Sequence, residues 1–134
     1  MAGYSGTPLA QKLGLKAGHA LVTIGAPADY RALIGTIAND LVIGTRISAK
    51  ADVVHLFTAR RTELDRLLSD CRSTLKPTAT VWVSWPKKAS KVASEVTEDL
   101  VREVALPLGF VDVKVCAVSD VWSGLKLVVR TELR

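Results

Sequence analysis

The sequence predicts an α/β protein: one mostly parallel sheet with helices on both faces and an antiparallel hairpin at its C-terminal end. Short runs rich in β-branched and aromatic residues alternate with longer segments of helical periodicity. The central run, residues 79–85, is apolar on both parities, which is typical of a strand covered by helices on both sides. The last two strands are joined by residues 119–124, a connection short enough for a hairpin.

Composition sets the broad class. With 134 residues, 49% hydrophobic and 23% charged, the chain is typical of one globular domain, not of a disordered segment. No apolar run approaches the roughly 20 residues that span a bilayer, and Met1–Ser5 lacks the features of a signal peptide. Cys71 and Cys116 lie in apolar patterns, which favours buried reduced thiols in a cytoplasmic protein.

The chain begins with a short helix and a short strand. We expect the helix over Pro8–Leu13, with Thr7 as its N-cap, and the strand over Ala20–Gly25. Because so short a helix is unstable alone, the segment Tyr4–Leu9 should pack onto the body of the domain. Pro27 opens a second helix. The residues that share one face of that helix are Tyr30, Leu33, Ile34 and Ile37.

Two further strands follow, over Leu41–Ile47 and Asp52–Ala59. A parallel crossover needs about a dozen residues or more, and fewer separate these strands. The first of them is therefore either very short or antiparallel. Thr62 and Asp65 then predict a variant capping box at the start of a helix. The buried stripe of this helix is Leu64, Leu67, Leu68, Cys71 and Leu75.

The central strand ends at Pro86, which has no N–H to continue the ladder. Ser94 or Thr97 caps the next helix, and Gly109 ends it. Numbering the strands along the chain, we predict the spatial order 2-1-3-4-6-5. The two strands of the closing hairpin are Val111–Val118 and Leu125–Arg130.

A candidate site lies where the parallel strands end. Carboxyl ends of neighbouring parallel strands share one edge, about 4.8 Å apart, and open α/β sheets bind ligands there. Cations and aromatic rings at that edge suit a planar or phosphorylated anion. In the alternative interpretation, the tryptophans pack the sheet edge and the cations are merely solvated. The candidate ligand-binding residues are Arg60, Arg61, Trp85, Lys87, Lys88, Trp122 and Ser123.

The sequence offers few groups for catalysis. His55 lies inside an apolar strand without an evident Ser or Asp partner, a pattern more typical of a core histidine than of a base. No metal-ligand spacing, nucleophile elbow or phosphate-binding loop is present. We therefore predict no catalytic residues, no metal site and no cofactor.

Three segments resemble a small bacterial family of unknown function: Tyr4–Leu9, Trp85–Ser90 and Trp122–Lys126. This resemblance implies no activity. In topology the chain also resembles the C-terminal half of the class I methyltransferases, a Rossmann-like sheet closed by a reversed hairpin.

The methyltransferase resemblance implies S-adenosylmethionine, held by an acidic residue and several glycines after strand one and by an acidic residue after strand two. Here Thr23–Asp29 has a single glycine and a proline in the turn, and Gly44–Arg46 follows strand two. These departures count against that cofactor.

The main functional hypothesis is a small ligand-binding or regulatory domain, not an enzyme, whose partner is a small anionic ligand. One alternative is a divergent methyltransferase-like enzyme. The other is a basic nucleic-acid or protein interaction module, based on the net charge of +5 and on Lys87, Lys88 and Lys91. Nucleic acid is the less favoured partner, because three lysines in one loop are common. The sequence leaves the ligand and the oligomeric state open.

Overall fold

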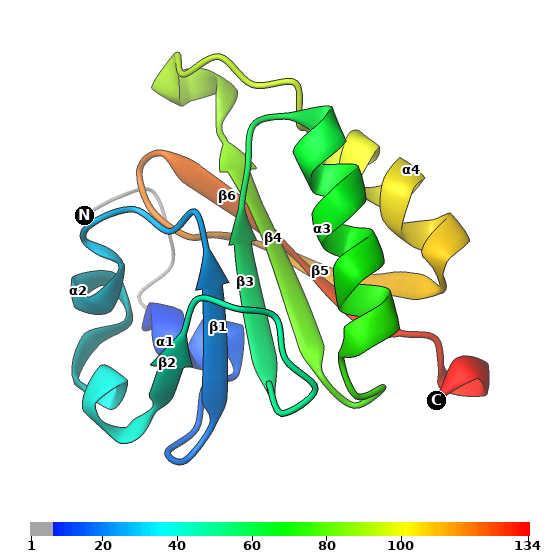
Figure 1. Cartoon of the computed structure of the whole chain (residues 1–134). Coiled ribbons are helices and arrows are strands. Elements are labelled where there is room, and N and C mark those ends of the chain that lie inside the picture. Colours follow the sequence, from blue (N-terminus) through cyan, green and yellow to red (C-terminus); the bar gives the residue numbers. More distant parts are fainter. Residues whose placement is uncertain (1–6) are drawn as a thin grey trace.

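The computed structural model describes residues 7–134, which form a six-stranded sheet in the order β2-β1-β3-β4-β6-β5 (Figure 1). Strands β1 to β4 run parallel, and β6 is antiparallel to both β4 and β5. Both the predicted strand order and the predicted fold class are confirmed. The strands are β1 (Ala20–Ile24), β2 (Val42–Gly44), β3 (Val53–Phe57), β4 (Thr80–Pro86), β5 (Phe110–Ala117) and β6 (Trp122–Val129).

Helices cover both faces of this sheet. The α-helices are α1 (Leu9–Leu13), α2 (Tyr30–Ile34), α3 (Arg61–Thr74) and α4 (Glu98–Leu108). Short 3-10 turns are η1 (Gly35–Asp40), η2 (Lys88–Ser90) and η3 (Thr131–Leu133). Figure 1 shows α3 and α4 together on one side of the strands, with α1 and α2 on the other. In β3, every residue of which is buried, Val54 and Leu56 join the core under α3 and α4, while Val53 and Phe57 join the other core.

Strand β2 is very short and parallel to β1, so it ends well before the predicted Ile47. The crossover from β2 to β3, residues 45–52, contains no helix and passes over β1 on the α3 side (Figure 1). Ala51 is 1% exposed, and Ile47 packs against the same core. A packed loop therefore replaces the usual helix, and the connection is shorter than the customary dozen residues.

Three of the predicted helix starts are wrong. Helix α2, expected to open at Pro27, begins at Tyr30 with Asp29 in the N-cap position. The Pro8 carbonyl accepts the first hydrogen bonds of α1, so Pro8 takes the N-cap position that was expected for Thr7. Helix α3 begins at Arg61, which puts Thr62 inside the first turn and leaves the expected capping box unformed. At α4, by contrast, Thr97 Oγ1 accepts from the Leu100 N–H at 3.1 Å, as predicted.

The first helix packs on the sheet, as expected for so short an element. Leu13 is 1% exposed, and its carbonyl oxygen accepts a hydrogen bond from Trp82 Nε1 at 3.2 Å. Leu9 packs against the same core. Of the segment that was predicted to fold back, residues 4–6 lie outside the described part of the chain.

The closing hairpin is tighter than predicted, because β6 begins at Trp122 and not at Leu125. Ser119 Oγ makes the turn by accepting from the N–H groups of Val121 and Trp122, both at 3.2 Å. Gly124, expected in the turn, lies in the ladder opposite Ser84. A Cβ on Gly124 would come within 3.1 Å of Ser84 Oγ and 3.0 Å of Val118 Cγ2, so this glycine leaves room for the side chains packed on it.

Cys71 and Cys116 are free thiols, and burial raises the pKa of Cys71 to about 12. Among residues 7–134, no helix is both long and apolar enough to cross a membrane.

Candidate ligand-binding site

The C-terminal ends of β1, β3 and β4 meet at one edge of the sheet, as their parallel pairing requires. Gly25 follows β1 with φ +71°, and a Cβ on it would lie 2.6 Å from the Phe57 carbonyl oxygen. The β1 turn therefore passes directly against the end of β3. The Lys87 N–H donates to the Val121 carbonyl at 2.7 Å, which ties the end of β4 to the hairpin turn.

Arg61 is engaged within the protein. Its guanidinium Nη2 lies 3.0 Å from Glu103 Oε2 on α4, in an exposed ion pair. Its backbone N–H donates to Glu95 Oε1 at 2.9 Å. A carboxylate thus already stands at the N-terminus of α3, the end at which a helix favours negative charge.

Arg60 is exposed and lines a shallow hollow of about 420 Å³. The Glu95 N–H donates to the Ala59 carbonyl at 2.8 Å, which fixes the wall of this hollow to the end of β3. No ion pair among the described residues involves Arg60. The other lining residues are Ala59, Ala93, Ser94 and Glu95.

Trp85 and Lys88 line a more enclosed cavity of about 200 Å³ between the end of β4 and the start of α4. Trp85 is only 7% exposed and provides an apolar wall, while Lys88 is exposed. Lys87 is half-buried in the turn itself, and its carbonyl accepts from Ser90 Oγ at 2.6 Å. The remaining lining residues are Pro86, Val92, Ser94, Val96 and Thr97.

The two tryptophans predicted for the site lie on opposite faces of the sheet. Trp85 belongs to the core under α3 and α4. Trp122 packs against the other core, edge-on to Phe57 with ring centroids 5.0 Å apart. Ser123 pairs with Trp85 across the ladder. The structure therefore brings Trp85, Lys87 and Lys88 together with Ser123 and Arg60 nearby, but it does not form an aromatic clamp from both indoles.

Sequence reasoning missed the polar partners of His55. This imidazole is fully buried; its Nδ1 lies 2.9 Å from Tyr30 Oη and its Nε2 lies 2.7 Å from Ser84 Oγ. Burial lowers the pKa of His55 to about 3, so the ring is neutral at ordinary pH. Ser84 is also 0% exposed, so this serine–histidine pair is enclosed and does not face a substrate.

The sequence did contain a sign of this pairing. Ser84 lies two residues after Trp82 and so shares its face of the strand, which predicts that the Ser84 hydroxyl is buried. His55 is likewise a polar residue in a buried strand, next to the strand of Ser84. Two unpartnered polar groups in neighbouring buried strands are expected to bind one another.

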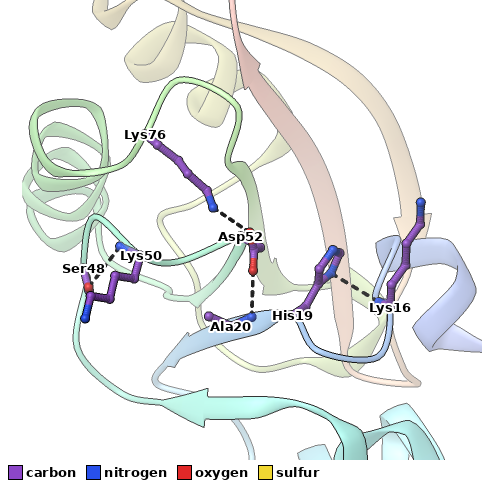
Figure 2. Close-up of polar contacts among 7 residues, drawn as sticks. All are labelled: Lys16, His19, Ala20, Ser48, Lys50, Asp52 and Lys76. Atoms are coloured by element: carbon purple, nitrogen blue, oxygen red, sulfur yellow. Dashed lines mark hydrogen bonds and ion pairs between the residues drawn. The ribbon is translucent and has the colours of Figure 1, made fainter.

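The opposite edge of the sheet is closed by its own polar contacts (Figure 2). Asp52 Oδ1 accepts from Lys76 Nζ at 2.6 Å, and Oδ2 accepts from the Ala20 N–H at 2.8 Å. The Lys76 ammonium, followed by the Ala20 N–H, lowers the pKa of Asp52. Within residues 7–134, no group of three His, Cys, Asp or Glu side chains is placed to hold a metal ion.

A family model described as "Protein of unknown function (DUF3052)" matches residues 10–131. The chain belongs to this family. Two of the segments that carried the bacterial-family resemblance, Trp85–Ser90 and Trp122–Lys126, fall inside the matched range, while Tyr4–Leu9 begins before it. Among curated proteins, none matches this DUF3052 chain.

Several solved structures similar to this DUF3052 protein are methyltransferases. A putative type 11 methyltransferase from Sulfolobus solfataricus has a TM-score of 0.64 and 14% identity, covering 92% of this chain and 90% of that one. A SAM dependent methyltransferase from Aquifex aeolicus has a TM-score of 0.61 and 15% identity, and the match covers 91% of this chain and 88% of that one. At such identities the similarity concerns the fold alone. It confirms the methyltransferase-like topology.

The DUF3052 chain is smaller than some of these proteins. Mitomycin 7-O-methyltransferase has a TM-score of 0.63 and 13% identity, covering 92% of this chain and 53% of that one. The chain therefore spans about half the length of that enzyme.

The residues at the first two turns do not fit the usual S-adenosylmethionine site. Gly25, the one glycine after β1, is needed for the close approach to Phe57, and the helix that follows has only 5 residues. After β2 stand Thr45 and Arg46, both exposed, where the methyltransferases commonly have an acidic residue. These positions supply neither the glycine-rich turn nor the ribose-binding carboxylate.

Proposed function

We propose that this DUF3052 protein is a small ligand-binding domain that takes a compact anion at the C-terminal edge of its sheet. The observation that carries the proposal is the cavity lined by Trp85 and Lys88. Its volume of about 200 Å³ is smaller than the roughly 300–1,000 Å³ typical of drug-sized ligands. The size favours a small organic acid or phosphate ester.

The residues that line the cavity can contact both the apolar body and the acidic group of such a ligand. Trp85, Pro86 and Val96 offer apolar surface to its body, and the Lys88 ammonium offers charge to its acidic group. Ser94 lines both this cavity and the adjacent hollow beside Arg60. A second positive group therefore borders the next space along the edge.

Binding fits this lining better than catalysis does. None of the described residues around the cavity is a His, Cys, Asp or Glu. The hydroxyls of Ser94 and Thr97 already bind backbone groups of Val96 and Leu100. The cavity thus offers charge and apolar contact without an acid–base pair.

Calorimetry with benzoate, phenyl phosphate and the uncharged benzyl alcohol tests this proposal. We expect the two anions to bind and the alcohol to bind more weakly. Lys88→Gln should weaken anion binding about fivefold, because it removes an exposed charge. Lys50→Gln, an exposed lysine at the opposite edge, is the matched control and should leave affinity unchanged. Wild-type affinity in both Lys88→Gln and Arg60→Gln would contradict the proposal.

Methyl transfer is the second candidate, favoured by the similarity in fold to the methyltransferases. Calorimetry with S-adenosylmethionine separates it from the first candidate. Binding of this cofactor would favour an enzyme that holds it without the usual turn residues. Absence of binding at millimolar cofactor would remove the enzyme hypothesis and leave the anion-binding one standing.

A further inference from the structure

A third hollow lies on the α3 side of the sheet, separate from the cavity at Trp85 and from the hollow beside Arg60. It is a groove of about 330 Å³ between the β2–β3 crossover and α3, and it shares no lining residue with that cavity. Figure 1 shows the crossover in front of β1 and facing α3. The lining residues are Ile24, Thr45, Arg46, Ile47, Arg66, Leu67, Asp70 and Thr74.

The groove exists because the crossover has no helix. A helix between β2 and β3 would pack beside α3 and cover this part of the sheet, as in ordinary parallel α/β units. Here the loop fills only part of that space, chiefly through Ile47 and Ala51. Ile24 and Ile47 are left half-buried, and both pack against the core to which Leu67 belongs. The floor of the groove is therefore apolar.

Two guanidinium groups from separate elements border this apolar floor. Arg46 comes from the crossover and Arg66 from α3, and both are exposed. No ion pair or hydrogen bond of the described residues involves the Arg46 side chain. Arg66 Nη1 lies 3.7 Å from Asp70 Oδ2, too far for a hydrogen bond, in a pair whose side chains are 63% and 52% exposed. The one carboxylate in the groove thus offsets only part of its positive charge.

We propose that this groove binds a small amphipathic acid, meaning a carboxylate or phosphate monoester that carries a short apolar body. The acidic group lies between Arg46 and Arg66, because guanidinium forks bind carboxylate and phosphate oxygens well. The apolar body covers Ile24 and Ile47, which removes half-exposed apolar surface from water. This site is independent of the anion site proposed at Trp85.

An NMR titration of the full chain tests the proposal, with hexanoate, hexyl phosphate and the uncharged hexanol as probes. Hexanoate should shift the backbone amides of residues 45–47 and 66–74 more strongly than those of residues 85–97. Comparison of hexanoate with hexyl phosphate shows which acid the groove prefers. Hexanol should bind more weakly than either acid, because it offers nothing to the two arginines.

Charge variants give the decisive comparison. Arg46→Gln and Arg66→Gln should each weaken hexanoate binding about threefold, and the double variant about tenfold, as expected for exposed charge pairs. Arg31→Gln, an exposed arginine on α2 across the sheet, is the control and should bind as the wild type does. All three positions are exposed, so the melting temperature should not change. The proposal is overturned if the double variant binds hexanoate with wild-type affinity, if hexanol binds as tightly as hexanoate, or if only residues 85–97 respond.

Discussion

At the N-terminal edge of the sheet polar side chains bind one another, whereas at the C-terminal edge several cations have no such partner. Asp52 joins Lys76 to the Ala20 backbone and so fixes β1, β3 and the start of β4 (Figure 2). At the other edge, no ion pair of the described residues includes Lys87 or Lys88.

The contrast separates two uses of charge. At the N-terminal edge the ion pair stabilises the fold. At the C-terminal edge Arg60, Lys87 and Lys88 make no ion pair with the described residues, and we propose that they serve a ligand there, as in other open α/β sheets. Backbone contacts also hold the C-terminal edge together: Gly25 lies against the Phe57 carbonyl, and the Lys87 N–H donates to the Val121 carbonyl.

The largest expected effect comes from a change in backbone packing at the C-terminal edge. Gly25→Ala adds a Cβ 2.6 Å from the Phe57 carbonyl oxygen, at a residue with φ +71°. We expect a loss of about 3 kcal/mol in the free energy of unfolding, from strain and overpacking together. Urea denaturation measures it. Gly44→Ala is the matched control, because its Cβ would meet nothing within 4 Å. An equal loss in both variants would mean that the close approach at Gly25 is not what matters.

The second largest expected effect is a loss of stability at acidic pH, caused by His55, which is buried beneath the edge. Its pKa is about 3 in the folded protein, because burial disfavours the charged ring, and about 6.5 in an unfolded chain. The unfolded state therefore binds the extra proton as pH falls below about 6.5, and stability is lost in that range down to about pH 3. Stability should be complete above about pH 7 and lower by about 2 kcal/mol at pH 5.

Urea denaturation at pH 7 and pH 5 checks this expectation. The lowered pKa of Asp52 acts in the same direction, but its contribution is lost at more acidic pH than that of His55, as the pH falls from the usual carboxyl range toward the lowered pKa of Asp52. The NMR shifts of the His55 ring should stay constant between the two pH values. A ring that titrates near pH 6 in the folded protein would show that it is not enclosed by Tyr30 and Ser84.

The smallest expected effects come from charge variants, one at each edge of the sheet, and they compare the two edges directly. Asp52→Ala should lower the free energy of unfolding by about 1–2 kcal/mol, a value reduced because the side chains of Asp52 and Lys76 are 31% and 39% exposed. Lys88→Gln should change it by less than about 0.5 kcal/mol. Thermal or urea unfolding of both variants measures the difference. Similar losses would show that both edges use their charges for folding.

The strand order could be predicted because it depends on local pattern. Apolar residues of both parities in 79–85 indicated a central strand, and the short final connection indicated a hairpin. The start of α3 could not be predicted. Its first N–H is bound by Glu95, a residue 34 positions further along the chain, and no local motif reports such a partner.

The candidate site was predicted in part. The convergence of Arg60, Trp85 and Lys88 on one edge followed from parallel pairing alone. The face that Trp122 occupies did not follow, because it depends on the exact length of the turn. Moving the start of β6 by three residues brings Trp122 into the ladder, and the alternation of side chains then fixes its face.

The hydrogen bond between Trp82 Nε1 and the Leu13 carbonyl has an optical consequence. The three tryptophans lie in distinct surroundings: Trp82 is 0% exposed, Trp85 is 7% exposed and Trp122 is half-buried. An indole that is enclosed and bonded to α1 emits at short wavelength and is shielded from dissolved quenchers. We therefore expect the tryptophan emission of the protein to shift to longer wavelength when α1 leaves the sheet, because Trp82 then loses its cover and its hydrogen bond to Leu13.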